Sequence, residues 1–282
     1  MTRSRSTDNT YRQKKSSEWT YQWSKFRHTG EFLFEDWIKP VVLEDFRGKD
    51  VLDAGCGSGQ HACLVAPLAN HVTAADLNTT EIAKEQAKGL DNIDFVEADI
   101  ATMDLGQTFD IVYCIGVIHH TDNPSRTFEN LYRHVKPGGT LIIWTYSSEG
   151  NFLVRYGVDP FRKLFLKKIS RDLLQINLEG KGLKKIATVI TAFMHPIVHT
   201  VYRIELFRFL PFFDYFKNFR RMTFEENILN VFDKLTAPQT IFTTRSVAEG
   251  WFCTERFRTD SISIIHYAGV SYSLVGVKPV ED

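Results

Sequence analysis

Short apolar runs alternate with helix-compatible stretches through the first half of the chain. The run from Phe109 to Ile115 is almost continuously apolar, as a strand buried on both faces requires. Five alternations of strand and helix within about a hundred residues predict an α/β fold built on a doubly wound parallel sheet. The expected strands are Asp50 to Ala54, His71 to Asp76, Ile93 to Glu97, Phe109 to Ile115 and Thr140 to Tyr146.

Turn-forming and capping residues mark the expected helix ends in this region. Asn78, with Glu81 three residues later, has the spacing of a capping box at a helix start. Asn123 and Pro124 are typical of a helix cap followed by its first residue. The Lys-Pro-Gly-Gly sequence at 136–139 is expected to end that helix.

The pattern changes from Asn151 to Thr240, where the alternation stops. A basic amphipathic helix is predicted at 161–174, and a strongly apolar segment follows at 186–202. That second segment contains two histidines and a proline and is short for a membrane span. We therefore expect a largely helical insertion, followed by a helix at 245–252 and a terminal antiparallel pair of strands near 261–266 and 271–277.

Four parts are expected along the chain. Residues 1–17 are polar and basic and predict a disordered arm, without the apolar stretch of a secretory signal. Residues 18–150 form helices and a ligand-binding core, with a helical run predicted from Phe32 to Val42. The insertion occupies 151–240, and residues 241–282 complete the core.

A glycine-rich loop follows the first strand. Gly55, Gly57 and Gly59 alternate with single residues, and a helix-compatible segment comes next. Strand, glycine loop and helix is the order in which a backbone approaches a ligand closely. Asp53 lies inside this motif, so it repels a dinucleotide diphosphate and attracts an ammonium group. Asp76 ends the second strand, where a carboxylate accepts hydrogen bonds from both hydroxyls of a ribose. Together these features indicate a nucleoside with an amino-acid tail, S-adenosylmethionine.

Charge and cysteine content narrow the function classes. The net charge of the whole chain is zero, so the composition does not favour nucleic-acid binding. The charge is unevenly distributed, because Lys and Arg exceed Asp and Glu by about eight from Asn151 to Arg220. The four cysteines show no Cys-x-x-Cys pairing and are interpreted as reduced thiols of a cytoplasmic protein, with Cys56 and Cys114 as small core residues.

These motifs resemble, in order and spacing, the class I S-adenosylmethionine-dependent methyltransferases, and within them the ubiquinone/menaquinone-type small-molecule group. The resemblance spans about Lys49 to Tyr146 and includes Ala98-Asp99-Ile100, the stretch Gly116 to Asp122, and the Lys-Pro-Gly-Gly sequence. It implies a seven-stranded, mostly parallel sheet of the Rossmann-like methyltransferase fold. The long insertion departs from the common core, so the acceptor class does not carry over.

The resemblance also implies roles for individual residues. The three glycines wrap the methionine part of S-adenosylmethionine, with Asp53 beneath it, and Asp76 and Leu77 border the ribose. Asp99 receives the adenine amino group, and Ile100 lies against the ring. The backbone near Ile115 accepts from the methionine ammonium. The product is S-adenosylhomocysteine.

His119 and His120 follow the fourth strand, where acceptors bind in sheets of this type. Imidazole titrates in the range useful for removing a proton from an acceptor, so both are candidate catalytic residues. The alternative is that one packs against the cofactor and the other caps a loop. Tyr146 is a further candidate. No metal is expected, because Pro196 distorts the turn between His195 and His199 and no carboxylate or cysteine lies nearby in the sequence.

Two segments are candidates for contact with the acceptor. Tyr21, Gln22 and Trp23 are interpreted either as a lid over the cofactor or as part of an aromatic helix packed on the core. The insertion allows three interpretations: a cap that lines an acceptor pocket, a dimerisation element, or a basic and aromatic surface for peripheral membrane contact. A monomer and a homodimer are both compatible with the sequence.

The leading hypothesis is methyl transfer to an O, N or C nucleophile of a small molecule, including lipid-, quinone- or sugar-linked acceptors. RNA methylation is an alternative, although the chain has neither an Asn/Asp-Pro-Pro-Tyr tetrapeptide nor a Pro-Cys pair. A protein that binds S-adenosylmethionine for regulation, without turnover, is another alternative. A nicotinamide-dependent dehydrogenase is disfavoured by the glycine spacing and by Asp53.

Overall fold

The computed structural model describes residues 31–152, 154–158, 160, 181–236 and 239–280. It divides into two compact units: 1–146 with 238–265 and 272–282, and 147–237 with 266–271. The predicted arm, the candidate lid residues Tyr21, Gln22 and Trp23, and the basic helix expected at 161–174 lie outside the described residues.

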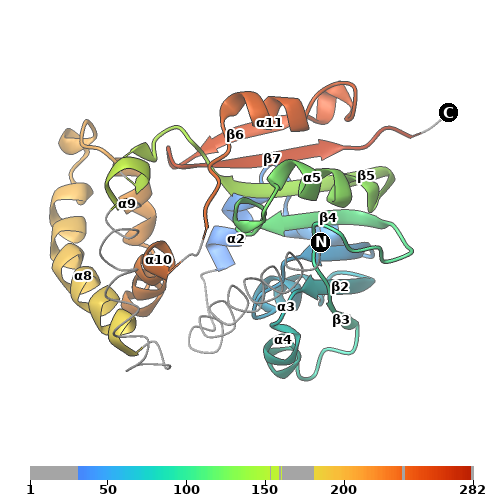
Figure 1. Cartoon of the computed structure of the whole chain (residues 1–282), viewed down its shortest axis with the longest axis horizontal. Helices are drawn as coiled ribbons and strands as arrows, with labels where there is room; N and C mark the ends of the chain where they lie inside the picture. Colours follow the sequence, from blue (N-terminus) through green and yellow to red (C-terminus); the bar gives the residue numbers. More distant parts are fainter. Residues whose placement is uncertain (1–30, 153, 159, 161–180, 237–238, 281–282) are drawn as a thin grey trace, which may run out of the picture. The chain divides into compact units, whose positions relative to one another are not determined.

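The first unit is built on a seven-stranded sheet in the order β3-β2-β1-β4-β5-β7-β6 (Figure 1). Strand order reverses between β1 and β4, which is where open α/β sheets bind ligands. The strands are β1 (Asp50–Ala54), β2 (His71–Asp76), β3 (Ile93–Glu97), β4 (Phe109–Ile115), β5 (Val135–Tyr146), β6 (Ser263–Tyr267) and β7 (Ser271–Val277).

The first five strands are parallel, and β7 runs antiparallel to them, between β5 and β6. Asp53 of β1 lies opposite Ala74 of β2 and Tyr113 of β4 in parallel register. The amide of Gly138 near the start of β5 donates to the carbonyl of Lys278 just after β7. Because the beginning of β5 meets the end of β7, these two strands are antiparallel. The doubly wound, mostly parallel sheet predicted from the sequence is confirmed.

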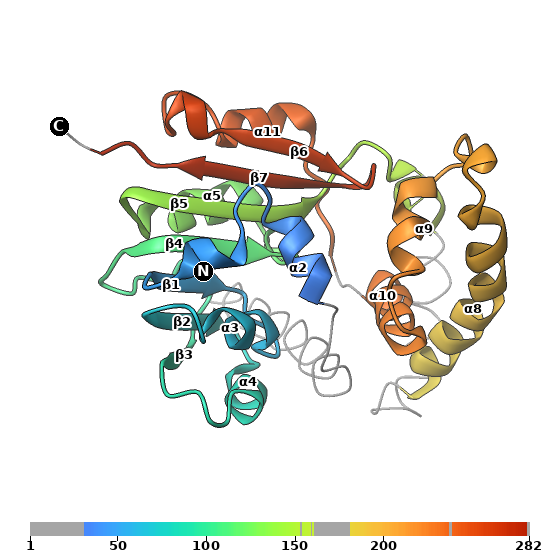
Figure 2. The same cartoon turned by 180° about the vertical axis from the view of Figure 1, so that it is seen from behind.

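Two hydrophobic cores cover the two faces of this sheet, and β4 contributes to both. Ile111, Tyr113 and Ile115 belong to one core, and Val112 and Cys114 belong to the other. This alternation explains why β4 is apolar at almost every position. The helices lie on both faces, as Figures 1 and 2 show from opposite sides. They are α2 (Glu31–Trp37), α3 (Gln60–Val65) and α4 (Thr80–Gln86) on one face, and α5 (Pro124–Arg133) and α11 (Arg245–Trp251) on the other.

Aromatic stacking reinforces the core beneath α5 and α11. The rings of Phe128 and Trp251 are nearly parallel, with centroids 5.4 Å apart, and those of Phe252 and Phe257 are 4.7 Å apart. A Cβ at Gly276 of β7 would lie 2.7 Å from the Phe257 ring, so this strand position must lack a side chain. The short 3-10 segments of this unit are η1 (Leu43–Phe46), η2 (Ile118–His120) and η7 (Thr259–Ser261).

Three of the expected boundaries are wrong, two for local reasons and one for a tertiary reason. Thr79 rather than Asn78 precedes α4, because the Asn78 amide donates to Asp76 and is held in the loop. β5 begins at Val135, since Gly138 and Gly139 pair with Lys278 instead of ending a helix in a loop. Helix α2 ends at Trp37, ahead of Pro40, rather than continuing to Val42.

The expected cap at the start of α5 is confirmed. The Asn123 side chain accepts from the Arg126 amide at 3.0 Å, and Pro124 is the first helical residue.

The second unit is largely helical. It contains α8 (Lys181–Thr200), α9 (Phe213–Phe219) and α10 (Phe224–Thr236), with α8 packed along α10. Its described part also contains a π-helical turn (η3, Val154–Val158) and two 3-10 segments, η5 (Val201–Arg203) and η6 (Glu205–Phe207). Within the described ranges, no helix is both long enough and apolar enough to cross a membrane.

Candidate active site

The glycine loop joins β1 to α3 at the point where the strand order reverses. Gly55, Gly57 and Gly59 all have positive φ, at 89°, 54° and 79°. A Cβ at Gly55 would lie 2.7 Å from the Val117 side chain, and one at Gly59 would lie 2.9 Å from the Ala83 Cβ. At Gly55 and Gly59 only glycine satisfies both the backbone conformation and the packing, so the chain makes a narrow, largely buried turn of peptide groups.

Asp76 at the end of β2 organises this loop. One carboxylate oxygen accepts from the Gly57 amide at 3.0 Å, and the other accepts from the Asn78 amide at 3.3 Å. A carboxylate has about four acceptor positions, so both oxygens retain capacity for a further donor such as a ribose hydroxyl. Leu77 follows with its side chain exposed.

Asp53 is the buried counterpart of Asp76. Its side chain is 2% exposed, and its Oδ2 atom has no hydrogen-bond partner among the residues that the structure describes. Burial raises the pKa of this carboxyl to about 7, although the Tyr113 hydroxyl beside it favours the charged form. A buried carboxylate oxygen without a partner fits a cationic ligand group such as the ammonium of S-adenosylmethionine.

This raised pKa makes ligand binding proton-linked. In the free protein Asp53 is largely protonated below about pH 7, and an ammonium group beside it favours the carboxylate. Binding of S-adenosylmethionine at about pH 6 should therefore release close to one proton, and affinity should fall as the pH is lowered. At about pH 8.5 the release should vanish. Calorimetry in buffers of different ionisation enthalpy measures this proton directly.

Asp53→Asn is the control for that measurement, because the amide keeps the shape and cannot titrate. The variant should bind S-adenosylmethionine more weakly, with no proton release at either pH. Equal release from the wild type and Asp53→Asn would show that another group titrates.

The raised pKa of Asp53 also affects the stability of the protein without ligand. The folded protein binds the proton of Asp53 more tightly than the unfolded chain does. The contribution of Asp53 to the free energy of unfolding therefore falls as the pH rises from 3.8 to about 7.

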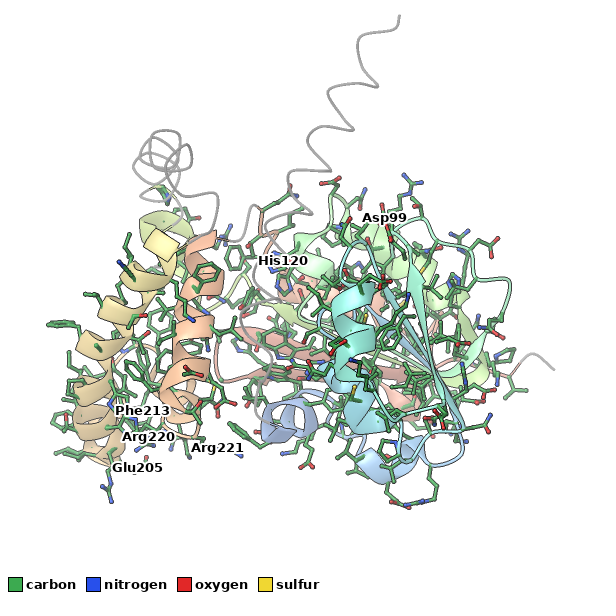
Figure 3. The ribbon with its side chains drawn as sticks, turned by 90° about the horizontal axis from the view of Figure 1, so that it is seen from below. Asp99, His120, Glu205, Phe213, Arg220 and Arg221 are labelled. Atoms are coloured by element: carbon green, nitrogen blue, oxygen red, sulfur yellow. The ribbon has the colours of Figure 1, made fainter. Side chains whose placement is uncertain are left out.

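Asp99 and Ile100 follow β3 at the same edge of the sheet. Asp99 Oδ1 accepts from the Ala101 amide at 2.9 Å, which shapes the turn after the strand. Ile100 is buried, and its carbonyl accepts from the Asn130 side chain. The structure thus places Ile100 mainly in the core, and Asp99 in the partly exposed turn (Figure 3).

The two histidines after β4 have different surroundings. His119 is fully buried, and its Nδ1 lies 3.4 Å from the Tyr146 amide, which donates to it. His120 is partly buried, and its Nδ1 lies 2.6 Å from the Gln239 carbonyl oxygen. A carbonyl only accepts, so Nδ1 of His120 carries the proton, and Nε2 is the basic nitrogen of the neutral ring. His120 is labelled in Figure 3.

An aromatic cluster surrounds these histidines at the carboxyl ends of β4 and β5. The Tyr146 ring centroid lies 4.4 Å from that of His119 and 5.3 Å from that of Trp144. Trp144 in turn lies 4.6 Å from Trp37 of α2. Ile115 ends β4 beneath this cluster, and Gly116 follows with φ 78°. The structure therefore brings Tyr146 and both histidines together.

Sequence reasoning missed Trp37, His61 and Trp144. His61 on α3 stacks on Phe34, with ring centroids 4.7 Å apart, and desolvation lowers its pKa to about 4. Trp144 lies two residues before Tyr146 in β5, on the same face of the strand, and the period of two was the one available signal. Nothing in the sequence indicated that α2 would place Trp37 against it.

The second unit has a cavity of its own, of about 260 Å³. Phe152, Phe212 and Phe213 supply aromatic walls, and Arg208 and Asp214 supply charge. Among the residues that the structure describes, no group of three or more His, Cys, Asp and Glu side chains has a metal-binding arrangement.

Comparison with known proteins finds similarity over the part of the chain that contains the glycine loop. Residues 52–143 match the family described as "Methyltransferase domain". The ubiquinone biosynthesis O-methyltransferase of Rickettsia conorii is 34% identical over 107 residues, which cover 37% of this chain and 37% of that protein. The demethylmenaquinone methyltransferase of Clavibacter sepedonicus is 29% identical over 132 residues, covering 46% of this chain and 52% of the relative. The chain thus spans from about a third to about half of the length of these curated relatives.

Solved structures include similar chains. The N-methyltransferase NodS from Bradyrhizobium japonicum WM9 aligns over 88% of this chain and 96% of its own, with a TM-score of 0.46 and 11% identity. The matched segment, 52–143, contains Asp53, the three glycines, Asp76, Asp99 and both histidines. This segment is therefore similar to a methyltransferase domain, and the similarity covers about a third of the chain.

Proposed function

We propose that this chain transfers the methyl group of S-adenosylmethionine to a hydroxyl oxygen of a small apolar ring compound of the quinol type. The observation that carries the proposal is the pairing of two features at one edge of the sheet. A buried Asp53 oxygen without a partner among the described residues lies at the end of β1, beside the glycine loop, and a histidine–aromatic cluster lies at the ends of β4 and β5. The names of the relatives from Rickettsia conorii and Clavibacter sepedonicus both refer to a quinone. The name of the first also specifies methylation of an oxygen atom.

The residues around the loop hold and orient the donor. S-adenosylmethionine, when bound, supplies an activated methyl group on a sulfonium. Asp53 would hold its ammonium group and Asp76 its ribose, while the positive-φ glycines leave room for a close backbone approach. Methyl transfer from sulfur leaves a neutral group, so geometry rather than anion stabilisation is the main requirement. Well-aligned reactants gain roughly 7–11 kcal/mol in such reactions.

His120 is the proton acceptor in this proposal. Its Nδ1–H is fixed by the Gln239 carbonyl, and this hydrogen bond orients the ring and makes Nε2 the basic atom. His119 is buried against the β5 backbone and acts by positioning its neighbour, with ring centroids 4.2 Å apart. The partly exposed ring of Tyr146 offers an apolar surface suited to an aromatic acceptor, and the buried Trp144 ring supports it from the core.

The test is an incubation of the purified protein with isotopically labelled S-adenosylmethionine and a panel of acceptors. The panel contains a short-chain hydroquinone, a catechol, an amino sugar and a transfer RNA. Label in a phenolic ether of the first two supports the proposal. Label in the amine or in the RNA would replace it with another acceptor class. Tight binding of S-adenosylmethionine with no transfer to any acceptor in the panel would favour the regulatory alternative.

A further inference from the structure

The long helix α8 is apolar around most of its circumference, but the described residues cover only one side of it. Ala187, Thr191 and Val198 are buried on the side that packs along α10. Helices that are apolar all round are normally buried all round. The uncovered side of α8 therefore requires an explanation other than core packing.

Four large apolar side chains form that uncovered side, here called the α8 face: Ile186, Val189, Phe193 and Ile197. Val189 is 68% exposed and Phe193 is 74% exposed. Their spacing of three and four residues places them in one stripe. From Ile186 to Thr200 the sequence contains no Asp, Glu, Lys or Arg. A solvated helix face of this length would normally carry charge, and scattered single apolar residues do not produce a stripe.

Basic residues lie at both ends of the α8 face. Lys184 and Lys185 precede it, and Arg203 and Arg208 follow it. The segment after the helix adds two more apolar side chains, Leu206 and Phe209, each 78% exposed. Apolar residues bounded by cations are typical of a helix that lies in the interface of a bilayer, with its basic side chains reaching the headgroups.

We propose that the α8 face, together with Leu206 and Phe209, rests on an anionic lipid surface. Charge decides between this occupant and a second copy of the chain. From Lys184 to Arg208 the sequence has four Lys and Arg against one acidic residue, Glu205, so two such faces repel each other and are attracted to anionic lipid. Interfacial helices of this type bury their apolar side about 5–10 Å deep and do not span. This is consistent with the finding that no described helix is long and apolar enough to cross a membrane.

Co-sedimentation of the full chain with lipid vesicles tests the proposal without any methyl donor. The wild type should bind vesicles of phosphatidylcholine mixed with phosphatidylserine. It should bind vesicles of phosphatidylcholine alone much more weakly. Val189→Ser with Phe193→Ser should lower the partition coefficient at least about tenfold, since two exposed apolar groups leave the interface. Lys185→Gln with Arg203→Gln should lower it by a similar factor on the anionic vesicles only.

Val280→Ser is the matched control, because Val280 is 67% exposed in the first unit and lies outside the proposed surface. It should bind vesicles like the wild type. Unchanged binding by both double variants would overturn the proposal, as would absence of wild-type binding to anionic vesicles. Analytical ultracentrifugation tests whether a second copy of the chain occupies the α8 face instead. If the wild type is a dimer and the Val189→Ser, Phe193→Ser variant is a monomer, the lipid proposal is overturned. Circular dichroism confirms that the variants remain folded. None of these readouts depends on the acceptor or on turnover.

Discussion

Replacing Asp76 with alanine should raise the dissociation constant for S-adenosylmethionine about 10²- to 10⁴-fold. The side chain would lose two charge-assisted hydrogen bonds to the ribose, each worth about 1.5–3 kcal/mol. It would also release the Gly57 amide, which the carboxylate now holds at 3.0 Å, so the glycine loop loses an internal support. Isothermal titration calorimetry with S-adenosylhomocysteine measures the loss without turnover.

Glu97→Ala is the matched control for this measurement. Glu97 is a carboxylate that pairs with Asp76 in the register of β2 and β3 and has an exposed side chain. Its removal should leave the dissociation constant within about twofold of the wild-type value. A thermal melt of both variants separates ligand binding from folding. Unchanged affinity in a folded Asp76→Ala protein would refute the ribose assignment.

The sequence predicted the strands of the core to the residue in several cases, and the reason is physical. β1, β2, β3, β4 and β7 begin and end where apolar runs meet Gly, Asp or other polar residues, so local chemistry marks their limits. The glycine loop was equally accessible, because Gly55 and Gly59 serve a local turn and a close contact. Such features depend on neighbours in the chain.

Features that depend on distant partners were not predictable in the same way. β5 extends through Lys136 because its ammonium pairs with Asp50 and Asp110 at 3.1 Å and because Lys278 pairs with the glycines that follow. Trp37 reaches Trp144 only because α2 packs on the sheet. No spacing rule encodes contacts between residues so far apart in the chain.

The insertion shows the same limit more strongly. Hydrophobicity at 186–202 indicated a helix but did not show which side of it would be covered. That depends on α10, which begins at Phe224 and buries only one side of α8. The exposed stripe at Val189 and Phe193 is therefore a result of the structure, while the basic residues around it were visible beforehand.

His120→Ala should lower kcat for methyl transfer to a hydroxyl acceptor about 10²- to 10⁴-fold, the usual contribution of a positioned base. Affinity for S-adenosylmethionine should stay within about threefold, since the ring is assigned to the acceptor side. The loss should shrink as the pH rises, because the acceptor hydroxyl then ionises without help. A purely structural role would lower the rate equally at every pH, so the pH–rate profile is the deciding measurement.

His71→Ala supplies the control for general effects of removing an imidazole. His71 begins β2, at the opposite end of the strand from Asp76, and its ring lies 3.1 Å from Asp94. That variant should keep the wild-type kcat and pH profile. His120→Gln tests the tautomer argument separately, because its amide still donates to the Gln239 carbonyl and cannot take up a proton. Wild-type rates in His120→Gln would show that the hydrogen bond, rather than the basic nitrogen, is what the reaction needs, and the proton would then go directly to solvent.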